Sequence, residues 1–498
     1  MSRALAPAAA PTEPAERAEP QTQATAPKED VARSPVKRFR LSVLRAAGWS
    51  IGGYVCIQLL RISSSLVLTR LLVPEMFGLM AVATMVQVAV AMLSDLGLRP
   101  AAIQSPLGDQ RNYLDSAWTL QFLHGLLIWA ACLCVGYLIS VAQSQDLMAA
   151  GSVYNESALP AVIAVSSFSS VIAGLQSTKV ITAYRRLELG RLTAIELVAQ
   201  CAGLGVAVVL AVQTRSVWSF VFATLCSAAL TTALSFLWLS GRGNRFRLDR
   251  DCVRDLIRFG KWVMLSSTFT VVASNGDRIL LAGWVGPATL GLYILSFNLV
   301  SMLEGAGSRL FHSVAVPALS QIRRESPEGL AQAYWRLRLP FDVLFVTAAG
   351  AIFATGDVLV AVLYDSRYEA AGSMLKILSF SLLFSRFGIF ANVYFAMGEP
   401  RILTAFNFVR GLSIFLLLPI GYLLFDMDGA VWAVALHGAP SFLLLLFFQV
   451  RHRLNNLKLE LLVLLAWPLG YVAGLSAEWM LSPVVSCPNW PIGDSVVA

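Results

Sequence analysis

The segment LVLTRLLVPEMFGLM at residues 66–80 decides the fold, because the segment ILLAGWVGPATLGLY at residues 279–293 repeats its pattern. In each copy a proline, followed four residues later by a glycine, separates two apolar stretches. The offset between the copies is constant along the match. The matching positions are Pro74 with Pro287, Gly78 with Gly291, and Leu79 with Leu292. The sequence therefore predicts two similar halves.

Apolar stretches of about twenty residues, separated by short polar loops, run from Ala47 to near Val472. A helix of about 20 apolar residues crosses the hydrocarbon core of a bilayer. Hydrophobic residues make up 57% of the 498 residues and charged residues 14%, whereas about 25% charged is usual in soluble domains. We therefore predict an all-α polytopic membrane protein. The expected spans are 47–70, 76–97, 116–140, 158–178, 191–213, 216–240, 259–284, 287–307, 339–363, 372–397, 402–425, 428–450 and 459–475.

The distribution of Lys and Arg predicts the orientation of these spans. With the N-terminus in the cytoplasm, most of the 38 Lys and Arg residues fall in cytoplasmic segments, as the positive-inside rule requires. An even number of spans separates the two repeat copies, so both halves have the same orientation. Parallel repeats are common in transporters, with the substrate path between the halves. We expect a multi-pass protein of the bacterial inner membrane with a cytoplasmic N-terminus.

These patterns divide the chain into five parts. Residues 1–46 are rich in Ala, Pro, Glu and Gln and predict a disordered cytoplasmic tail. Residues 47–240 and 259–450 are each expected to form a six-helix bundle. A basic cytoplasmic linker at 241–258 joins the bundles, and residues 451–498 add one or two C-terminal helices and a tail.

One polar stripe runs along the first predicted span and a second along the seventh. Helical periodicity places the members of each stripe on one face of the helix. Because two apolar helices keep their polar faces in register, we expect both faces to border a hydrated central cavity. The first stripe is Tyr54, Gln58, Arg61 and Ser65, and the second is Ser267, Thr270, Ser274, Asp277 and Arg278.

The functional prediction depends most on Arg61. Placing an arginine at the centre of the bilayer costs roughly 2.5–3.5 kcal/mol even on the insertion scales, which give the lower estimates. Such residues therefore face a cavity or a partner. The structural alternative is a buried ion pair with Asp95 or Asp277. If Arg61 and Arg278 instead line a cavity, their guanidinium groups favour an anionic, phosphate-bearing substrate.

Further charged residues lie within the predicted spans, and each has two interpretations. Arg386 and Arg410 are candidates for the substrate cavity, or they are structural. Carboxylates inside a span are candidates for proton or cation coupling, or they neutralise a nearby arginine. These coupling candidates are Asp95, Glu196, Asp277 and Glu304.

Residues 65–104 resemble the start of the polysaccharide transporter family, which includes Wzx-type O-antigen and exopolysaccharide flippases. The family turn motif, hydrophobic-R-L-L-P-E-x-F-G, is matched from Arg70 to Gly78 with Val73 inserted, and its L-x-D-L-G-L motif is matched at 93–98. Residues 275–300 are similar to a second family stretch. The shared positions there are Asp277, Leu280, Gly283, Gly286, Gly291 and Tyr293.

This resemblance implies a fold and a function. The family belongs to the multidrug/oligosaccharidyl-lipid/polysaccharide exporter (MOP) superfamily, which implies two six-helix bundles in a MATE-like inverted V and alternating access. It also implies that the substrate is a lipid-linked oligosaccharide, usually on undecaprenyl pyrophosphate, for O-antigen, exopolysaccharide or capsule biosynthesis. No cofactor is expected, and coupling to H⁺ or Na⁺ is the candidate energy source. Expected partners are this substrate, membrane lipids and a polysaccharide polymerase or chain-length regulator, and not nucleic acid.

Other functions are compatible with these features. A MATE-like drug or cation antiporter would need an acid-rich cavity, and a lipid II flippase is another relative. A membrane glycosyltransferase, or an O-antigen polymerase or ligase, would need a sizeable outer loop, whereas the longest ones, near 141–157 and 364–371, are short. The chain carries no Walker A motif. Its seven cysteines and four histidines form no metal-ligand pattern. Together with the short outer loops and the lack of a Walker A motif, this predicts a transporter and not an enzyme.

Overall fold

The computed structural model describes residues 35–95, 97–105, 107–108, 110–186, 188–241, 243–311, 315, 319, 322–323, 327–397 and 399–485. Met1–Leu44 and Arg45–Ala498 form separate units. Most of the tail predicted at 1–46 lies outside the described residues, as does the C-terminal end beyond residue 485. All the predicted site residues belong to the second unit.

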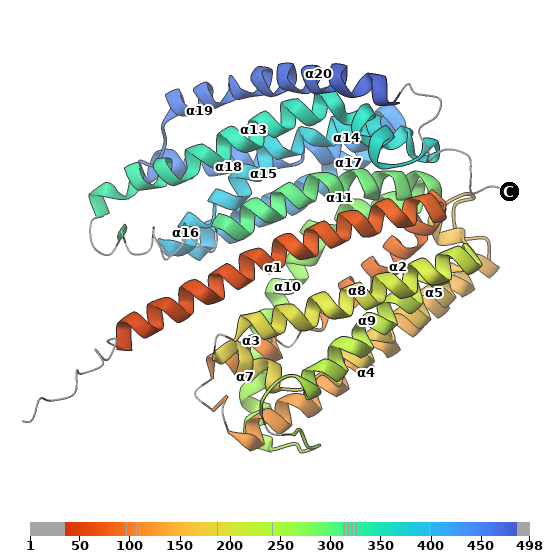
Figure 1. The fold of residues 1–498 in the computed structure, drawn as a ribbon, viewed down its shortest axis with the longest axis vertical. Helices are drawn as coiled ribbons and strands as arrows, with labels where there is room; N and C mark the ends of the chain where they lie inside the picture. Colours follow the sequence, from red (N-terminus) through yellow and green to blue (C-terminus); the bar gives the residue numbers. More distant parts are fainter. Residues whose placement is uncertain are drawn as a thin grey trace, which may run out of the picture. The chain divides into compact units, whose positions relative to one another are not determined.

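The first half of the chain folds into helices of very different lengths (Figure 1). Its elements are α1 (Pro35–Leu71), α2 (Pro74–Leu93), α3 (Leu98–Gln104), α4 (Arg111–Ser144), η1 (Val153–Asn155), α5 (Leu159–Ser166), α6 (Ser169–Gly174), α7 (Lys179–Arg185), α8 (Leu189–Thr214) and α9 (Trp218–Leu237).

The second half repeats this mixture of long and broken helices. Its elements are α10 (Arg250–Trp284), α11 (Pro287–Leu310), η3 (Pro327–Gly329), α13 (Leu330–Leu363), η4 (Ser366–Tyr368), α14 (Ala370–Ser379), α15 (Ser381–Phe390), α16 (Val393–Ala396), α17 (Pro400–Leu436), α18 (Gly438–Arg451), α19 (Leu457–Leu464) and α20 (Ala466–Val485).

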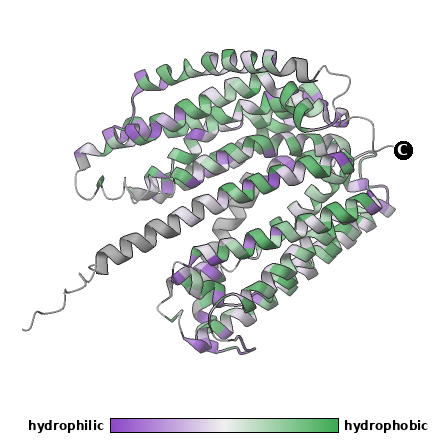
Figure 2. Cartoon of the chain, viewed as in Figure 1, coloured by the Kyte–Doolittle hydropathy of each residue, from purple (hydrophilic) through white to green (hydrophobic). Residues whose placement is uncertain are grey.

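Nine helices in the described part of the chain are long and apolar enough to cross a membrane, or up to eleven if each bent helix pair forms one span. One of the nine, Arg401–Arg451, covers two predicted spans. Its backbone is non-helical at Phe425 and Asp426, where the chain turns back on itself. Figure 2 shows hydrophobic residues along the helix bodies and hydrophilic residues mainly at helix ends and loops. The predicted all-α polytopic membrane fold is confirmed.

Both copies of the repeat form the same helix–turn–helix. Helices α2 and α11 begin at Pro74 and Pro287, directly after the short breaks that end α1 and α10. Proline suits this position because its ring fixes φ at a helical value and its missing N–H would have no partner there. Val73 and Gly286, which precede the two prolines, have extended backbones. That conformation is the one sterically favoured before proline.

Helices α2 and α11 pack against each other through the two glycines of the repeat. A Cβ atom on Gly78 would lie 2.1 Å from the carbonyl oxygen of Pro287, and one on Gly291 would lie 2.1 Å from that of Pro74. Exchanging each residue for its repeat partner turns one contact into the other. Such reciprocity is the mark of a two-fold axis. The two repeat segments therefore cross with local two-fold symmetry at this point.

The helices after the second half pack on α13. Helix α20 lies along α13 (Figure 1). A Cβ on Gly350 would lie 2.2 Å from the carbonyl oxygen of Trp467, and one on Gly470 would lie 2.0 Å from that of Thr347. Small residues allow helices in a membrane to approach this closely. The predicted span at 459–475 is thus an additional helix that is fixed to the second half.

The α2–α11 crossing predicts that Gly78→Ala and Gly291→Ala each lower the thermal stability of the purified protein. The added methyl group meets a backbone carbonyl, so the helices must separate, and overpacking of this kind costs about 1–3 kcal/mol. The measurement is the melting temperature in detergent. Gly205→Ala on α8 is the control, because a Cβ there meets open space. Equal melting temperatures for all three variants would contradict the close crossing.

Candidate functional site

The polar stripe of α1 lines a cavity of about 480 Å³ between α1 and α11. All four stripe residues border it, so the structure brings together the first predicted group. Helix α11 contributes the opposite wall, and the end of α13 closes one side. The polar and small lining residues are Tyr54, Gln58, Arg61, Ser65, Asn298, Ser301, Gly305 and Tyr364.

Contacts across this cavity connect α1 to the second half. The Tyr54 hydroxyl lies so close to Gly305 that a Cβ there would be 2.4 Å from it. The guanidinium of Arg309 lies over the Tyr54 ring, 5.4 Å from its centroid. The hydroxyls of Ser65 and Tyr364 are 3.5 Å apart. The cavity therefore lies between the two halves of the repeat.

A larger cavity, of about 670 Å³, lies inside the first half. Its walls come from α1, α2, α3, α6, α8 and α9, and they are rich in amide and hydroxyl side chains. Apart from Arg61 and Glu196, the sequence analysis did not identify its polar residues. The polar lining residues are Arg61, Ser64, Gln87, Arg99, Ser169, Ser170, Gln176, Glu196, Gln200, Thr224, Ser227, Thr231 and Thr232.

Hydrogen bonds organise part of this polar wall. The Arg99 guanidinium donates to Gln176 Oε1 at 2.9 Å. The Gln87 amide donates to the hydroxyls of Ser169 and Ser170 at 2.8 and 2.9 Å. Glutamines within apolar helices are a sequence signal that could have pointed to this wall, because an amide in a bilayer needs a polar partner.

Arg61 lines both cavities, so it lies where they adjoin. Its helix, α1, has the smallest buried share of the nine candidate spans, 11%. Within the described part of the chain, Arg61 is exposed and its side chain has no hydrogen bond or ion pair. The two alternative partners are engaged elsewhere: Asp277 accepts a 2.5 Å hydrogen bond from Tyr293, and Asp95 accepts one from the Gly97 amide at 2.8 Å. The guanidinium of Arg61 is therefore free to meet an anion.

Of the second predicted stripe, the two residues whose side chains the structure describes, Asp277 and Arg278, lie outside both cavities. Asp277 is buried against Tyr293. The Arg278 guanidinium lies over the Phe297 ring, 4.9 Å from its centroid, and neither residue lines the cavities. Ser267, Thr270 and Ser274 belong to α10, but their side chains lie outside the described residues.

Arg386 lies in a buried cluster of four charges and not on a cavity wall. Its guanidinium is 3.3 Å from Asp342 and 3.5 Å from Glu460. Arg338 pairs with the same two carboxylates at 2.8 and 2.7 Å. The side chains of Arg338 and Arg386 are only 0% and 4% exposed. Two carboxylates facing two guanidinium groups explain why Arg386 is held inside the protein.

Arg410 and Glu304 belong to another polar cluster in the second half. Glu304 accepts hydrogen bonds from the hydroxyls of Ser381 and Ser385, the former at 3.5 Å. Arg410 Nε donates to His437 Nε2 at 3.1 Å, and His437 Nδ1 donates to a backbone carbonyl. Arg410 and His437 line a space of only about 10 Å³. No sequence pattern predicted a role for His437.

Asp95 lines a separate space of about 270 Å³ together with Arg99 and His124. Arg99 also lines the 670 Å³ cavity, so Asp95 lies near that cavity without bordering it. Glu196 of α8 borders the cavity directly and is exposed. Among the residues that the structure describes, no group of three His, Cys, Asp or Glu side chains could hold a metal ion.

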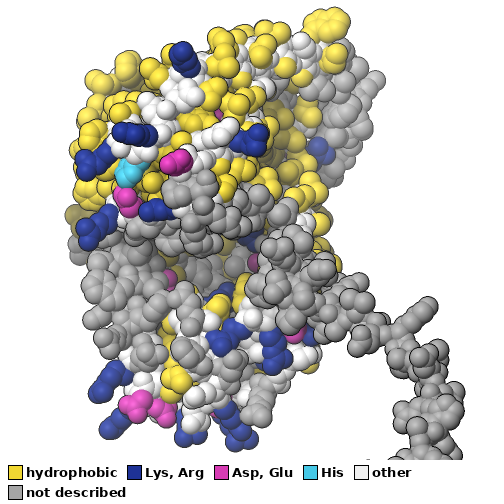
Figure 3. Space-filling view, turned by 90° about the vertical axis from the view of Figure 1, so that its left-hand side faces the viewer, with side chains coloured by type: hydrophobic (Ala, Val, Ile, Leu, Met, Phe, Trp, Pro, Cys, Tyr) yellow, Lys and Arg dark blue, Asp and Glu magenta, His cyan; other side chains and the backbone are white. Residues whose placement is uncertain are grey.

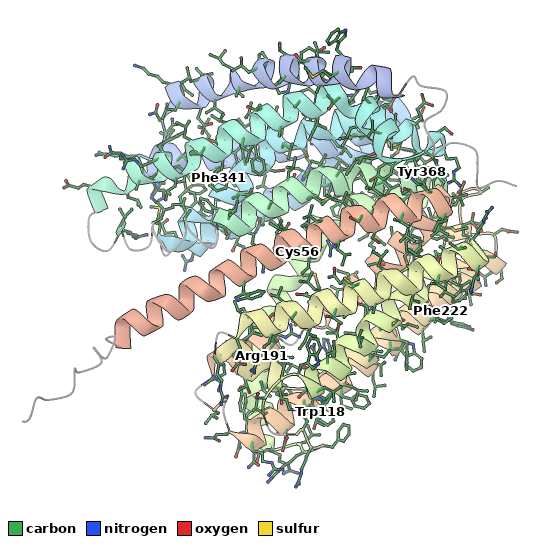
Figure 4. The ribbon with its side chains drawn as sticks, viewed as in Figure 1. Cys56, Trp118, Arg191, Phe222, Phe341 and Tyr368 are labelled. Carbon is green, nitrogen blue, oxygen red and sulfur yellow. The ribbon has the colours of Figure 1, made fainter. Side chains whose placement is uncertain are left out.

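Hydrogen bonds join the end of α1 to η4 of the second half. The Tyr368 hydroxyl donates to the Leu72 carbonyl at 2.7 Å, and Arg367 donates to the Thr69 carbonyl at 3.1 Å. Figure 4 shows Tyr368 beside this end of α1. Burial raises the pKa of Tyr368, so its hydroxyl keeps the proton that it donates. The α1–α2 turn is thereby fixed to the second half.

The chain has the fold of known membrane transporters. An inward-facing multidrug resistance MATE family transporter of the MOP superfamily superposes with a TM-score of 0.59 at 16% identity, covering 79% of this chain and 94% of that one. The lipid II flippase MurJ superposes with a TM-score of 0.60 at 11% identity, over 89% of this chain and 100% of MurJ. At such low identities these likenesses define the fold alone.

The family model described as "Polysaccharide biosynthesis protein" matches residues 67–396, and the chain belongs to this family. A relative from Klebsiella pneumoniae, "Uncharacterized membrane protein in cps region", is 23% identical over 429 residues, which are 84% of each chain. The "Lipopolysaccharide biosynthesis protein WzxC" of Escherichia coli (strain K12) is 23% identical over 345 residues, 68% of this chain and 67% of WzxC. The resemblance inferred from the sequence motifs is confirmed.

The different surroundings of Arg386 and Arg61 predict a large loss of stability for a substitution of Arg386 and almost none for a substitution of Arg61. Arg386→Met leaves Asp342 and Glu460 with one cation in a buried site, which costs about 3–5 kcal/mol. Arg61→Met removes an exposed side chain without a partner and changes stability by about 0.5 kcal/mol or less. Thermal unfolding of both purified variants checks this. A stable Arg386→Met variant would mean that the cluster does not depend on both arginines.

Proposed function

We propose that this protein is a flippase that moves a lipid-linked oligosaccharide across the bacterial inner membrane during polysaccharide biosynthesis. The observation that carries this proposal is the unpaired guanidinium of Arg61 where the two cavities adjoin. A guanidinium binds phosphate oxygens through two parallel hydrogen bonds, and it does so more strongly where water is scarce. Arg61 is therefore suited to hold the diphosphate of a lipid carrier such as undecaprenyl pyrophosphate.

The 670 Å³ cavity is suited to the sugar part of that substrate. Its amides and hydroxyls donate and accept hydrogen bonds, as do sugar hydroxyls. Its size lies within the usual range of ligand pockets. Arg61 would hold the diphosphate at the edge of this cavity, with the glycan inside and the lipid tail left in the bilayer.

Alternating access between the two halves supplies the transport step. The 480 Å³ cavity lies between them, and α1 separates it from the cavity of the first half. The hydrogen bonds of Tyr368 and Arg367 hold the end of α1 to the second half. Opening this end requires those bonds to break, and the low burial of α1 favours its movement. In this scheme, with a cytoplasmic N-terminus, these hydrogen bonds at the end of α1 lie on the outer side of the membrane. A polymerase or chain-length regulator receives the product.

The cluster of Glu304, Arg410 and His437 supports ion coupling in the second half. Glu304 is its carboxylate, and the groups facing it are Arg410 of α17 and the hydroxyls of Ser381 and Ser385 of α15. His437 accepts from Arg410, so uptake of a proton by either group would rearrange the cluster. We propose H⁺ as the coupling ion and this cluster as its site, in preference to a coupling site at Glu196 in the substrate cavity.

The charges of the cavities favour an anionic substrate over a drug cation. Among the described residues that line the larger cavity, the charged ones are the cations Arg61 and Arg99 and the carboxylate Glu196. A cation antiporter would need the opposite balance. A lipid II flippase would also carry a diphosphate, and the membership in a polysaccharide biosynthesis family favours a polysaccharide precursor. The fold, which is shared with membrane transporters, supports transport over a membrane glycosyltransferase or polymerase.

Arg61→Ala is expected to reduce polysaccharide export about tenfold or more, because a charge-assisted hydrogen bond contributes about 1.5–3 kcal/mol. Export is measured in a deletion strain that carries each variant, together with the lipid-linked precursor that accumulates in the membrane. Arg70→Ala is the matched control, since Arg70 is exposed at the end of the same helix and lines neither cavity. Normal export by an Arg61→Ala protein of normal abundance would refute the role of Arg61.

Glu304→Gln is expected to remove the dependence of transport on the proton gradient. The amide keeps the size of the side chain and its bonds to the serine hydroxyls but cannot bind a proton at neutral pH. Flipping is measured in proteoliposomes with and without an imposed pH gradient. The same measurement on Glu196→Gln should retain the response. If only Glu196→Gln loses it, the coupling carboxylate lies in the substrate cavity instead.

A further inference from the structure

A separate pocket of about 370 Å³, here named the basic pocket, lies at one end of the first half. It is formed by the start of α4, by α7 and by the loop between α9 and α10. None of its residues lines the two cavities of the transport site. The basic pocket is lined by Arg111, Leu114, Asp115, Thr178, Lys179, Thr182, Arg186, Gly241 and Gly243.

Cations exceed carboxylates in the basic pocket. Arg111, Lys179 and Arg186 line it, and Asp115 is its carboxylate. Arg111 is 3.7 Å from Asp115 and has a side chain that is 45% exposed. Arg186 is exposed, and its side chain has no hydrogen bond or ion pair to any described residue. Lys179 Nζ donates to the Phe236 carbonyl at 2.7 Å, which fixes its position.

Hydrogen bonds that do not involve the side chains of the three cations also hold the pocket wall together. Asp115 accepts a hydrogen bond from the Arg245 backbone at 3.1 Å, so this carboxylate is engaged by the loop. Asn244 donates to the Thr178 hydroxyl at 2.6 Å, and the Asp249 amide donates to the Ser116 hydroxyl at 3.0 Å. The loop is thus tied to both α4 and α7. The resulting pocket is preformed for a ligand.

We propose that the basic pocket binds a phosphate group, supplied either by the headgroup of an anionic lipid or by a soluble phosphate ester. Arg111 and Arg186 can each present a bidentate fork to phosphate oxygens, and Lys179 adds a nearby positive charge. Figure 3 shows Lys and Arg side chains gathered around a few carboxylates at the lower end of the view, where α7 lies in Figure 1.

The position of the pocket suits a ligand from the membrane surface. Lys179 and Arg186 fall in a loop for which the sequence predicts a cytoplasmic location, and α4 leads from the pocket into the apolar part of the molecule. Basic pockets between transmembrane helices on that side recognise anionic headgroups. Because the pocket is separate from Arg61, this proposal does not rest on the flippase function.

The test uses the full-length protein and two probes. One is the melting temperature in nanodiscs of phosphatidylcholine with and without phosphatidylglycerol. The other is the melting temperature in detergent during titration with inorganic pyrophosphate. We expect at least one probe to raise the melting temperature in a saturable manner, because a ligand that binds only the folded state stabilises it.

The variants remove the cations or add a carboxylate. Arg111→Gln with Arg186→Gln should abolish more than half of the rise. The matched control is Arg401→Gln with Arg451→Gln, which removes the same charge from exposed positions of the second half. Gly243→Asp keeps every cation and introduces a negative charge where a Cβ meets open space. It should abolish the rise as well, even if the double variant folds poorly.

Each outcome decides the proposal. Loss of the phosphatidylglycerol effect in the double variant and in Gly243→Asp, with the control unchanged, assigns the pocket to lipid headgroups. The same pattern with pyrophosphate alone assigns it to soluble phosphates. If neither probe stabilises the protein, or if the control variant loses as much as the pocket variants, the pocket does not bind phosphate.

Discussion

The structure depends on one close approach, the crossing of α2 and α11 at Gly78 and Gly291. Each glycine places its backbone against the carbonyl of the proline from the other copy of the repeat, and no side chain fits between them. In a membrane, helices associate through such packing because lipid supplies no hydrophobic driving force between them. The crossing sets the spacing of the two halves. With that spacing, a cavity lies between α11 and the polar face of α1, and Tyr54 contacts α11 at the edge of this cavity.

Burial decides which arginines are structural and which are available to a ligand. Arg338 and Arg386 are both charged and deeply buried, and each has two carboxylates within reach. An unpaired charge in such a place would cost several kcal/mol, so these four groups need one another. Arg61 has no such partner and is exposed to two cavities. Solvation within the cavities offsets the free-energy cost of the Arg61 charge when no substrate is bound, and a bound anion can replace that solvation.

The sequence predicted the helices and the repeat well, because both are recorded in local patterns. The turn near Phe425 and the restart at Pro287 fall where apolar stretches end. It predicted the site less well, because partners in space are far apart in the chain. Arg386 looked like a cavity residue since Asp342 and Glu460 belong to other helices. Arg99 and Gln176 were missed because no helical stripe contains them. Their shared cavity exists only after α3, α6 and α8 have packed.

The two halves share a fold but not an interior, and this difference limits where a large polar substrate can be held. In the first half, hydroxyl and amide side chains surround about 670 Å³ of space. In the second half, the polar cluster around Arg410 encloses about 10 Å³, and aromatic rings surround Arg338. Helix α20 is also fixed to α13 there through close glycine contacts. In the proposed function, the first half would hold the sugar and the second half would respond to the coupling ion. Helix α1, which lines both cavities, would link the two events.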